Sequence, residues 1–225
     1  MSVATHLSIR VDEYDSRIRT FVPGYEHLIA TAAETLGLLD ASSPVIIDLG
    51  AGTGALSARC LDLLPNAELI AVDSDPAMIE VARVRLQHHP RVSFLAGNFL
   101  ELVLPPCDAI VACIALHHVS SAQAKRDLYA ACHLALRPGG LLVSADCFPA
   151  RDARLAERQH RQWLAHLQQV YTAADAEAYL TSWALEDTYF PLEDELEWLS
   201  GAGFQPDVIS REGGFAVIAG RRRAN

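Results

Sequence analysis

Cysteine, basic charge and long apolar runs are all scarce in this chain of 225 residues. The five cysteines are an odd number and none forms a C-x-x-C pair, which argues against a disulfide framework or a structural zinc site. No apolar run is long enough for a transmembrane helix, and charged residues between Arg10 and Arg17 stand where a signal peptide would be apolar. We therefore expect a cytoplasmic chain with no membrane partner and no bound metal.

The excess of acidic residues limits the partners. The formal net charge of −10 repels a polyanion, so the composition disfavours nucleic acid. Arg221-Arg222-Arg223 is the only basic cluster, and we interpret it as a solvated tail. A length of 225 residues with 51% hydrophobic residues suits one domain with a full core, and a homodimer is left open.

A glycine-rich turn after a short apolar strand is the most informative stretch. Val45–Leu49 is β-branched and apolar, which predicts a buried strand; Gly50, Gly52 and Gly54 follow, and a helix begins at Ala55. Glycine lets the backbone approach a ligand closely, and the free N–H groups at a helix start are hydrogen-bond donors. The sequence therefore predicts a nucleotide-type cradle.

Two ligands fit this cradle, and Asp48 discriminates between them. The glycines match the dinucleotide fingerprint G-x-G-x-x-G/A. Together with Asp48 they also resemble motif I of the class I S-adenosylmethionine (SAM) methyltransferases. A carboxylate at the end of the strand repels a pyrophosphate but attracts a ligand that carries an ammonium and a sulfonium. This favours SAM over NAD.

Polar residues follow the next two expected strands. Leu69–Val72 is followed by Asp73, whose carboxylate can accept both ribose hydroxyls. Met78 lies in the first turn of the next expected helix, where its thioether can pack on an adenine face or in the core. Val92–Leu95 is followed by Asn98, whose amide can pair with adenine or cap its own loop.

Two histidines follow the expected central strand. Asp108–Ile114 is almost wholly apolar, as a central parallel strand should be, and His117 and His118 come directly after it. Either histidine is a candidate general base, and the alternative is a hydrogen-bonded wall residue. We expect Arg137–Gly140 to end the next helix and Leu141–Ala145 to form a fifth strand.

Strands and helices alternate five times, which predicts a doubly wound parallel sheet. Val208–Ile209 and Phe215–Ile218 predict a final hairpin, so we expect an α/β fold, Rossmann-like, with a seven-stranded mixed sheet. Within one domain, 1–225, we expect a helical N-terminal lid (1–40), a cofactor-binding core (41–150), a helical cap (151–190), and a last helix with the hairpin (191–225).

The lid and the cap supply the expected substrate contacts. Tyr14 and Tyr25 belong to the N-terminal segment, and Trp183 belongs to the helical block inserted after the fifth strand. This block follows the strand edge at which open α/β sheets bind ligands, which is the place for a substrate cap. For residues 25–39 a helix that packs on the sheet is an equally good interpretation.

The whole constellation resembles the class I SAM-dependent methyltransferases. The matching pieces are Asp48–Gly54, Asp73, Gly97–Phe99, Asp108–Ile114 and Leu136–Gly140, in the order and spacing of that family. The resemblance implies a methyltransferase fold and SAM as the cofactor. It implies that the glycine turn with Asp48 surrounds the methionine part and that Asp73 holds the ribose. It also implies an adenine pocket, although the family usually has aspartate where Asn98 stands. The full expected cofactor set is Asp48, Gly50, Ala51, Gly52, Gly54, Asp73, Ser74, Met78, Gly97, Asn98, Phe99 and Cys113.

A subgroup is also similar, namely the enzymes that modify the tRNA wobble uridine with carboxy-SAM. The likeness covers Tyr14–Arg17, Val22–Tyr25 and the helical block. Those enzymes hold the extra carboxylate with an arginine, and Tyr179–Ala184 at the corresponding place contains none. We therefore expect methyl transfer to a small or medium-sized acceptor at O, N or C. A tRNA-modifying methyl or carboxymethyl transferase and a SAM-binding protein without methyl transfer are the alternatives.

Overall fold

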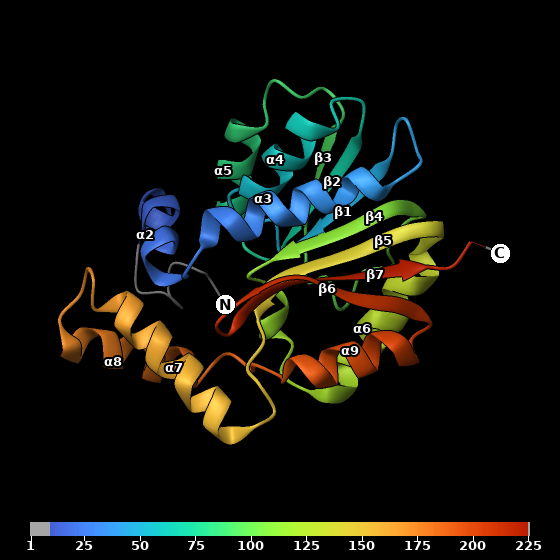
Figure 1. Ribbon diagram of the computed structural model, residues 1–225. Coiled ribbons are helices and arrows are strands. Elements are labelled where there is room, and N and C mark those ends of the chain that lie inside the picture. Colours follow the sequence, from blue (N-terminus) through green and yellow to red (C-terminus); the bar gives the residue numbers. More distant parts are fainter. Residues whose placement is uncertain (1–9, 225) are drawn as a thin grey trace.

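The computed structural model describes residues 10–224 and contains a seven-stranded sheet in the order β3-β2-β1-β4-β5-β7-β6 (Figure 1). Strands β1 to β5 are parallel, and β7 runs antiparallel to both of its neighbours. This confirms the expected mixed sheet with a closing hairpin. The strands are β1 (Val45–Leu49), β2 (Glu68–Asp73), β3 (Val92–Ala96), β4 (Cys107–Cys113), β5 (Leu136–Cys147), β6 (Phe204–Glu212) and β7 (Phe215–Arg222).

Helices cover both faces of the sheet, which explains why its central strands are continuously apolar. Successive residues of β1 point to opposite faces, so Ile46 packs in one hydrophobic cluster and Ile47 in the other. In Figure 1, helices lie both above and below the sheet. The upper helices are α3 (Tyr25–Thr35), α4 (Ala55–Leu63) and α5 (Pro76–Arg85), and the lower ones are α6 (Ala122–Ala135) and α9 (Leu192–Gly201).

Strand β5 is longer than the sequence predicts. Helix α6 ends at Ala135, directly before the expected stop at Arg137–Gly140, but the strand that we expected from Leu141 already begins at Leu136, where it pairs with Cys107. The register shifts between Cys107 and Ala109, which accommodates the extra residues. A Cβ on Gly140 would lie 2.8 Å from a backbone oxygen of β4, so this glycine permits a close approach that a composition-based prediction mistakes for a turn.

The inserted helical block forms a cap beside the carboxyl ends of the strands. It consists of α7 (Ala153–Leu167) and α8 (Ala173–Trp183), with α2 (Tyr14–Phe21) packed against it (Figure 1). The contact between cap and α2 is aromatic, since the Phe21 ring lies 5.1 Å from the ring centroids of Tyr179 and Trp183. Trp163 Nε1 donates a hydrogen bond of 2.7 Å to the Phe21 carbonyl. A large apolar contact thus fixes α2 to the cap.

The segment that we expected to act as a lid, 1–40, has two different parts among the described residues. Helix α3 packs on the sheet, with Leu28, Ile29 and Ala32 in the core. It therefore belongs to the core, as the alternative interpretation had it. Helix α2 alone lies beside the cap and remains the candidate lid. Residues 1–9 of the expected lid lie outside the described residues.

None of the helices in residues 10–224 is long and apolar enough to cross a membrane. Three short 3₁₀ turns complete the described chain, and the third of them carries the two histidines. They are η1 (Val11–Glu13), η2 (Leu36–Leu38) and η3 (Leu116–His118).

The aromatic contact between α2 and the cap should contribute to the free energy of unfolding. Phe21 is 1% exposed, so Phe21→Ala removes a buried ring and leaves a cavity. We expect the free energy of unfolding, measured by urea denaturation, to fall by about 3–5 kcal/mol. Val103→Ala, at a side chain that is 97% exposed, is the control and should change it by less than about 0.5 kcal/mol. Equal effects of the two variants would contradict the described packing.

Candidate cofactor and acceptor site

A cavity of about 460 Å³ opens between the carboxyl ends of the strands, α2 and the cap. Its lining includes Gly50, Gly52 and Asp73, which we assign to the cofactor end, and His117 and His118, which we assign to the acceptor end. The ends of parallel strands meet at one edge of a sheet, so residues far apart in the sequence surround one space. The cavity has the size of an ordinary small-molecule site.

The glycine turn is held by the carboxylate of Asp73. Gly52 N–H donates to one of its oxygens at 2.7 Å, and Asp75 N–H donates to the other at 2.8 Å. Gly50 has a φ of +70°, and a Cβ there would lie 2.5 Å from the Ala115 side chain, so only glycine fits. Each oxygen of Asp73 keeps a lone pair, and Asp73 lines the cavity, as its expected ribose role requires.

Asp48 does not line this main cavity. It lines a side pocket of about 20 Å³ together with Gly52 and Ala51. Its side chain is buried, and Ser57 Oγ donates to Oδ2 at 2.6 Å, whereas Oδ1 has no hydrogen-bond partner within residues 10–224. Burial raises the pKa of Asp48 to about 7, against the opposing effect of the Ser57 hydrogen bond. We expected an ionised group, and instead the carboxyl is poised to ionise when a cation arrives.

The buried Oδ1 of Asp48, which has no hydrogen-bond partner among the described residues, shows whether the site fits the cofactor. Leaving such an atom unsatisfied costs free energy, and an ammonium group would satisfy it. The side pocket shares Tyr14, Gly50 and Gly52 with the main cavity, so the two spaces adjoin. These residues therefore fit the amino-acid part of SAM.

Two tyrosines and a cysteine complete the side pocket. Tyr14 lines both spaces, whereas Tyr25 and Cys113 line only the side pocket. Burial raises the pKa of the Cys113 thiol well above its ordinary value, so the thiol is neutral. Tyr25 thus lies at the cofactor end, and not at the acceptor end where we expected it.

The expected adenine residues are only partly brought together. Ser74, Asn98 and Phe99 line the main cavity. The amide of Asn98 already accepts from Leu100 N–H at 3.1 Å and donates to Glu101, so it caps its own loop. Its expected bidentate pairing with adenine would need these bonds to change.

Met78, Gly54 and Gly97 do not line either space. Met78 has no exposed surface, because the inner face of α5 packs on β2 and β3, and this corrects the expected adenine contact. Gly97 donates its N–H to the Asp73 carbonyl at 2.8 Å and supports the strand end. A Cβ on Gly54 would lie 3.2 Å from Ala82, so this glycine serves helix packing.

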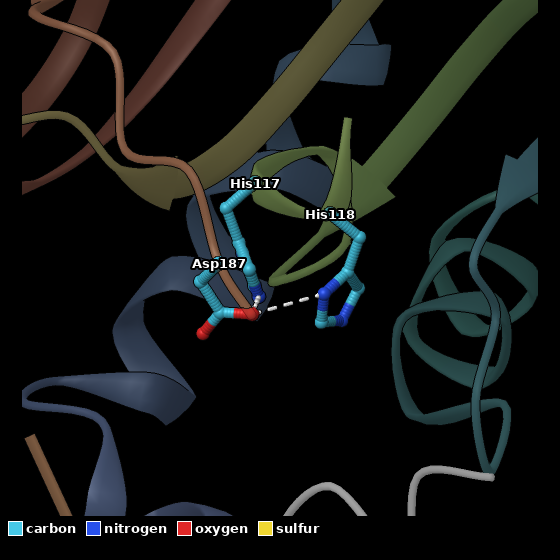
Figure 2. A group of neighbouring side chains, drawn as sticks. All are labelled: His117, His118 and Asp187. Carbon is cyan, nitrogen blue, oxygen red and sulfur yellow. Dashed lines mark ion pairs between the residues drawn. The ribbon is translucent and has the colours of Figure 1, made fainter. Parts of the chain in front are cut away.

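The acceptor end contains a cluster of His117, His118 and Asp187 (Figure 2). His117 Nδ1 lies 2.7 Å from Asp146 Oδ1, which fixes the ring. Burial opposes the charged imidazolium, but the carboxylates of Asp146 and Asp187 prevail and raise the pKa of His117 above its ordinary value. Tyr189 Oη donates to Asp187 Oδ2 at 2.6 Å and fixes the carboxylate.

His118 is the accessible member of the cluster. Its Nδ1 lies 3.1 Å from Asp187 Oδ1, and its side chain is 45% exposed, against 7% for that of His117. Both rings point toward Asp187 in Figure 2. Both histidines line the cavity, but only His118 has a largely accessible ring.

Sequence reasoning missed Asp146 and Asp187. Asp146 had a usable signal, since it ends a strand at the ligand edge. Asp187 follows α8 in a loop whose sequence gives no such signal. Trp183, which we expected as a substrate contact, lines the cavity with a buried indole N–H that has no hydrogen-bond partner among the described residues.

Comparison with known proteins finds methyltransferases among the relatives of this chain. A methyltransferase-domain family model matches residues 46–140. An uncharacterized methyltransferase of Anoxybacillus flavithermus is 28% identical, and the match covers 84% of this chain and 88% of that protein. A carboxy-S-adenosyl-L-methionine synthase of Photorhabdus laumondii is 27% identical over 64% of this chain and 59% of its own. For several curated relatives, the match covers only about three fifths of their length.

Solved structures show the same fold. The O-methyltransferase family 2 protein of Planctomyces limnophilus, in complex with apigenin, superposes with a TM-score of 0.70 at 19% identity, covering 99% of this chain and 62% of that one. The family model spans the glycine turn, Asp73 and the histidine-bearing turn η3, which together form one wall of the cavity. Residues 46–140 thus match a methyltransferase domain, and the chain has the fold of solved O-methyltransferases.

Proposed function

We propose that the chain transfers the methyl group of SAM to a small or medium-sized organic acceptor at O, N or C. The observation that carries the proposal is the cavity of about 460 Å³, which joins the cofactor end to the histidine cluster beneath the cap. A space of this size has to receive the reacting part of the cofactor and the acceptor together. The acceptor must therefore be of limited size.

The chemistry of the lining indicates an apolar or aromatic acceptor. Phe21, Trp163, Trp183 and Tyr189 all line the cavity on the side of α2 and the cap. Rings of this kind favour flat apolar ligands, and the buried Trp183 N–H can donate to one polar atom. The apigenin complex of the Planctomyces limnophilus protein supports an aromatic acceptor by analogy. The net charge of −10 argues against tRNA.

Binding and alignment are the main tasks of this chain's residues. SAM supplies a methyl group activated by the sulfonium. Asp73 holds the ribose, Asp48 takes the ammonium, and Ser74 with Phe99 borders the adenine. Holding the acceptor in line with the methyl carbon can lower the barrier by roughly 7–11 kcal/mol.

Proton removal is the second task where the acceptor atom carries a proton. His118 faces the cavity and is paired with Asp187, so it is the proposed general base, worth on the order of 10²–10⁴-fold. His117 is buried and fixed by Asp146, so it acts as a positioning residue.

Removing the carboxylate of Asp73 should weaken SAM binding. Asp73→Ala deletes an acceptor of two backbone N–H bonds and the proposed partner of the ribose. A charged hydrogen bond is worth about 1.5–3 kcal/mol, so we expect affinity, measured by calorimetric titration, to fall roughly tenfold to hundredfold. Asp62→Ala, at an exposed position, is the matched control. Wild-type affinity in a folded Asp73→Ala variant would refute the ribose assignment.

SAM affinity should rise with pH through the pKa of Asp48, which is about 7. The carboxyl is mostly protonated at pH 6 and mostly ionised at pH 8, and only the ionised form attracts the ammonium. Relative to Asp48→Asn, wild-type affinity should therefore increase roughly tenfold between these values. Parallel pH profiles of the two proteins in calorimetric titration would show that Asp48 does not meet the cofactor.

Ligand-free stability provides an internal control with the opposite sign. Because the pKa of Asp48 is raised from its usual 3.8, the folded chain binds an extra proton between that value and about 7. The contribution of Asp48 to the free energy of unfolding is thus fully present below the usual value and is lost as pH rises through about 7. Urea denaturation should show Asp48→Asn gaining stability over wild type from pH 5 to pH 8.

Methyl transfer itself is tested by the formation of S-adenosylhomocysteine. Mass spectrometry of reactions with a panel of phenols, amines and carbon acids should detect product, and tRNA should give none. His118→Ala should lower turnover on an active, proton-bearing acceptor roughly 10²–10⁴-fold and leave SAM affinity unchanged. Full activity of that variant would remove His118 from the mechanism, and product with tRNA alone would overturn the acceptor class.

A further inference from the structure

The side chains of His117, His118 and Asp187 bring three potential metal-ligand atoms close together. One ligand atom from each residue lies within 4.8 Å of the others. His117 Nε2 is 3.8 Å from Asp187 Oδ1, too long for a hydrogen bond, and His118 Nδ1 is 3.1 Å from the same oxygen. Three donor atoms thus converge on one small space.

The 3.1 Å distance between His118 Nδ1 and Asp187 Oδ1 already equals an edge of a metal coordination shell, and the 3.8 Å distance from His117 Nε2 is slightly longer than one. Bonds from a metal ion to nitrogen and oxygen are about 2.0–2.2 Å, so two neighbouring ligands of one ion lie roughly 3.0–3.5 Å apart. Small side-chain adjustments would bring all three atoms into this range. The His118 side chain is 45% exposed and lines the cavity, so the cluster is accessible from the cavity.

The supporting groups are also those of a metal site. A ligating histidine ordinarily gives its other ring nitrogen to a carboxylate, which fixes the ring, and Asp146 does this for His117 at 2.7 Å. Asp146 is itself fixed by N–H groups of Leu116 and Cys147. Tyr189 Oη donates to Asp187 Oδ2, which leaves Oδ1 on the side of the two imidazoles. Two carboxylates in the surroundings favour a dication.

We propose that this cluster is a site for a divalent transition-metal ion of the Zn²⁺ or Fe²⁺ class, with an open coordination position toward the acceptor end of the cavity. Two imidazoles and one carboxylate suit these ions better than Mg²⁺ or Ca²⁺, which prefer oxygen ligands alone. The proposal departs from the expectation of no metal, which rested on the absence of paired cysteines.

A metal here would select acceptors with an oxygen donor, such as a phenol or an enol, and this part of the inference rests on the proposed methyl transfer. Coordination lowers the pKa of a bound O–H group. The O–H bond breaks and the proton passes to bulk water. The oxygen then forms a bond to the methyl carbon, while the C–S bond breaks and leaves its electron pair on sulfur. In the metal-loaded chain, His118 serves as a ligand in place of its role as a base.

Metal binding is tested without SAM or acceptor, using chelator-treated full-length chain. Calorimetric titration with Zn²⁺ and absorption spectroscopy with Co²⁺ should show one ion per chain, with visible bands of nitrogen and oxygen ligation. His118→Ala and Asp187→Asn should weaken binding at least 100-fold, and Asp146→Asn roughly 10–100-fold. His160→Ala, at an exposed histidine of α7, is the matched control and should bind like wild type.

Binding of Zn²⁺ and Co²⁺ with less than one ion per chain in the wild type would overturn the proposal. Unchanged affinity in a folded His118→Ala variant would do the same, and circular dichroism verifies folding. Failure of this test is separate from failure of the proposed function: stoichiometric metal without S-adenosylhomocysteine formation would retain the site and reject methyl transfer. If a chelator does not change the rate of methyl transfer, the proposed role of the metal in binding the acceptor is refuted.

Discussion

The carboxylate of Asp73 is the constraint on which the cofactor end depends. Its two oxygens accept the N–H groups of Gly52 and Asp75, so one side chain ties the glycine turn to the start of α5. Two parallel strands are thereby held with their carboxyl ends in register. Burial raises the pKa of Asp73, while the two backbone hydrogen bonds oppose this shift and favour the ionised form. The same group that shapes the turn is therefore available to a ligand.

A second tie connects this turn to the candidate lid. Asp15 of α2 accepts a hydrogen bond of 2.7 Å from Thr53 Oγ1 and pairs with Arg85 of α5. Arg85 also donates to the Thr53 carbonyl at 3.0 Å. Helix α2 is thus fastened at one end to the cofactor turn by polar contacts and on its side to the cap by Phe21. Helix α2 covers one side of the cavity because it contacts both the glycine turn and the cap.

The glycine turn, Asp73 and the two histidines, all of which line the cavity, could be predicted from the sequence, whereas the partners of the histidines could not. The strand ends that carry Asp48 and Asp73 follow local apolar patterns, and the glycine turn constrains the backbone through sterics alone. The partners of the histidines are Asp146, which follows His117 by 29 residues, and Asp187, which lies in a loop after the cap helix α8. The expected adenine contact of Met78 was wrong, because this side chain lies on the face of α5 that packs in the core. A short amphipathic segment specifies only weakly which face of a helix is buried.

Charge around the cavity connects the two halves. Asp73, Asp146, Glu186 and Asp187 line the main space and Asp48 lines the side pocket, whereas no described lysine or arginine lines either. Such a lining attracts the sulfonium and ammonium of the cofactor and opposes an anionic acceptor or a developing phenolate. An acceptor that loses a proton therefore needs compensating positive charge close to its oxygen. Within the described chain, the cluster of His117, His118 and Asp187 is where that charge can be placed, either as a proton on an imidazole or as a bound dication.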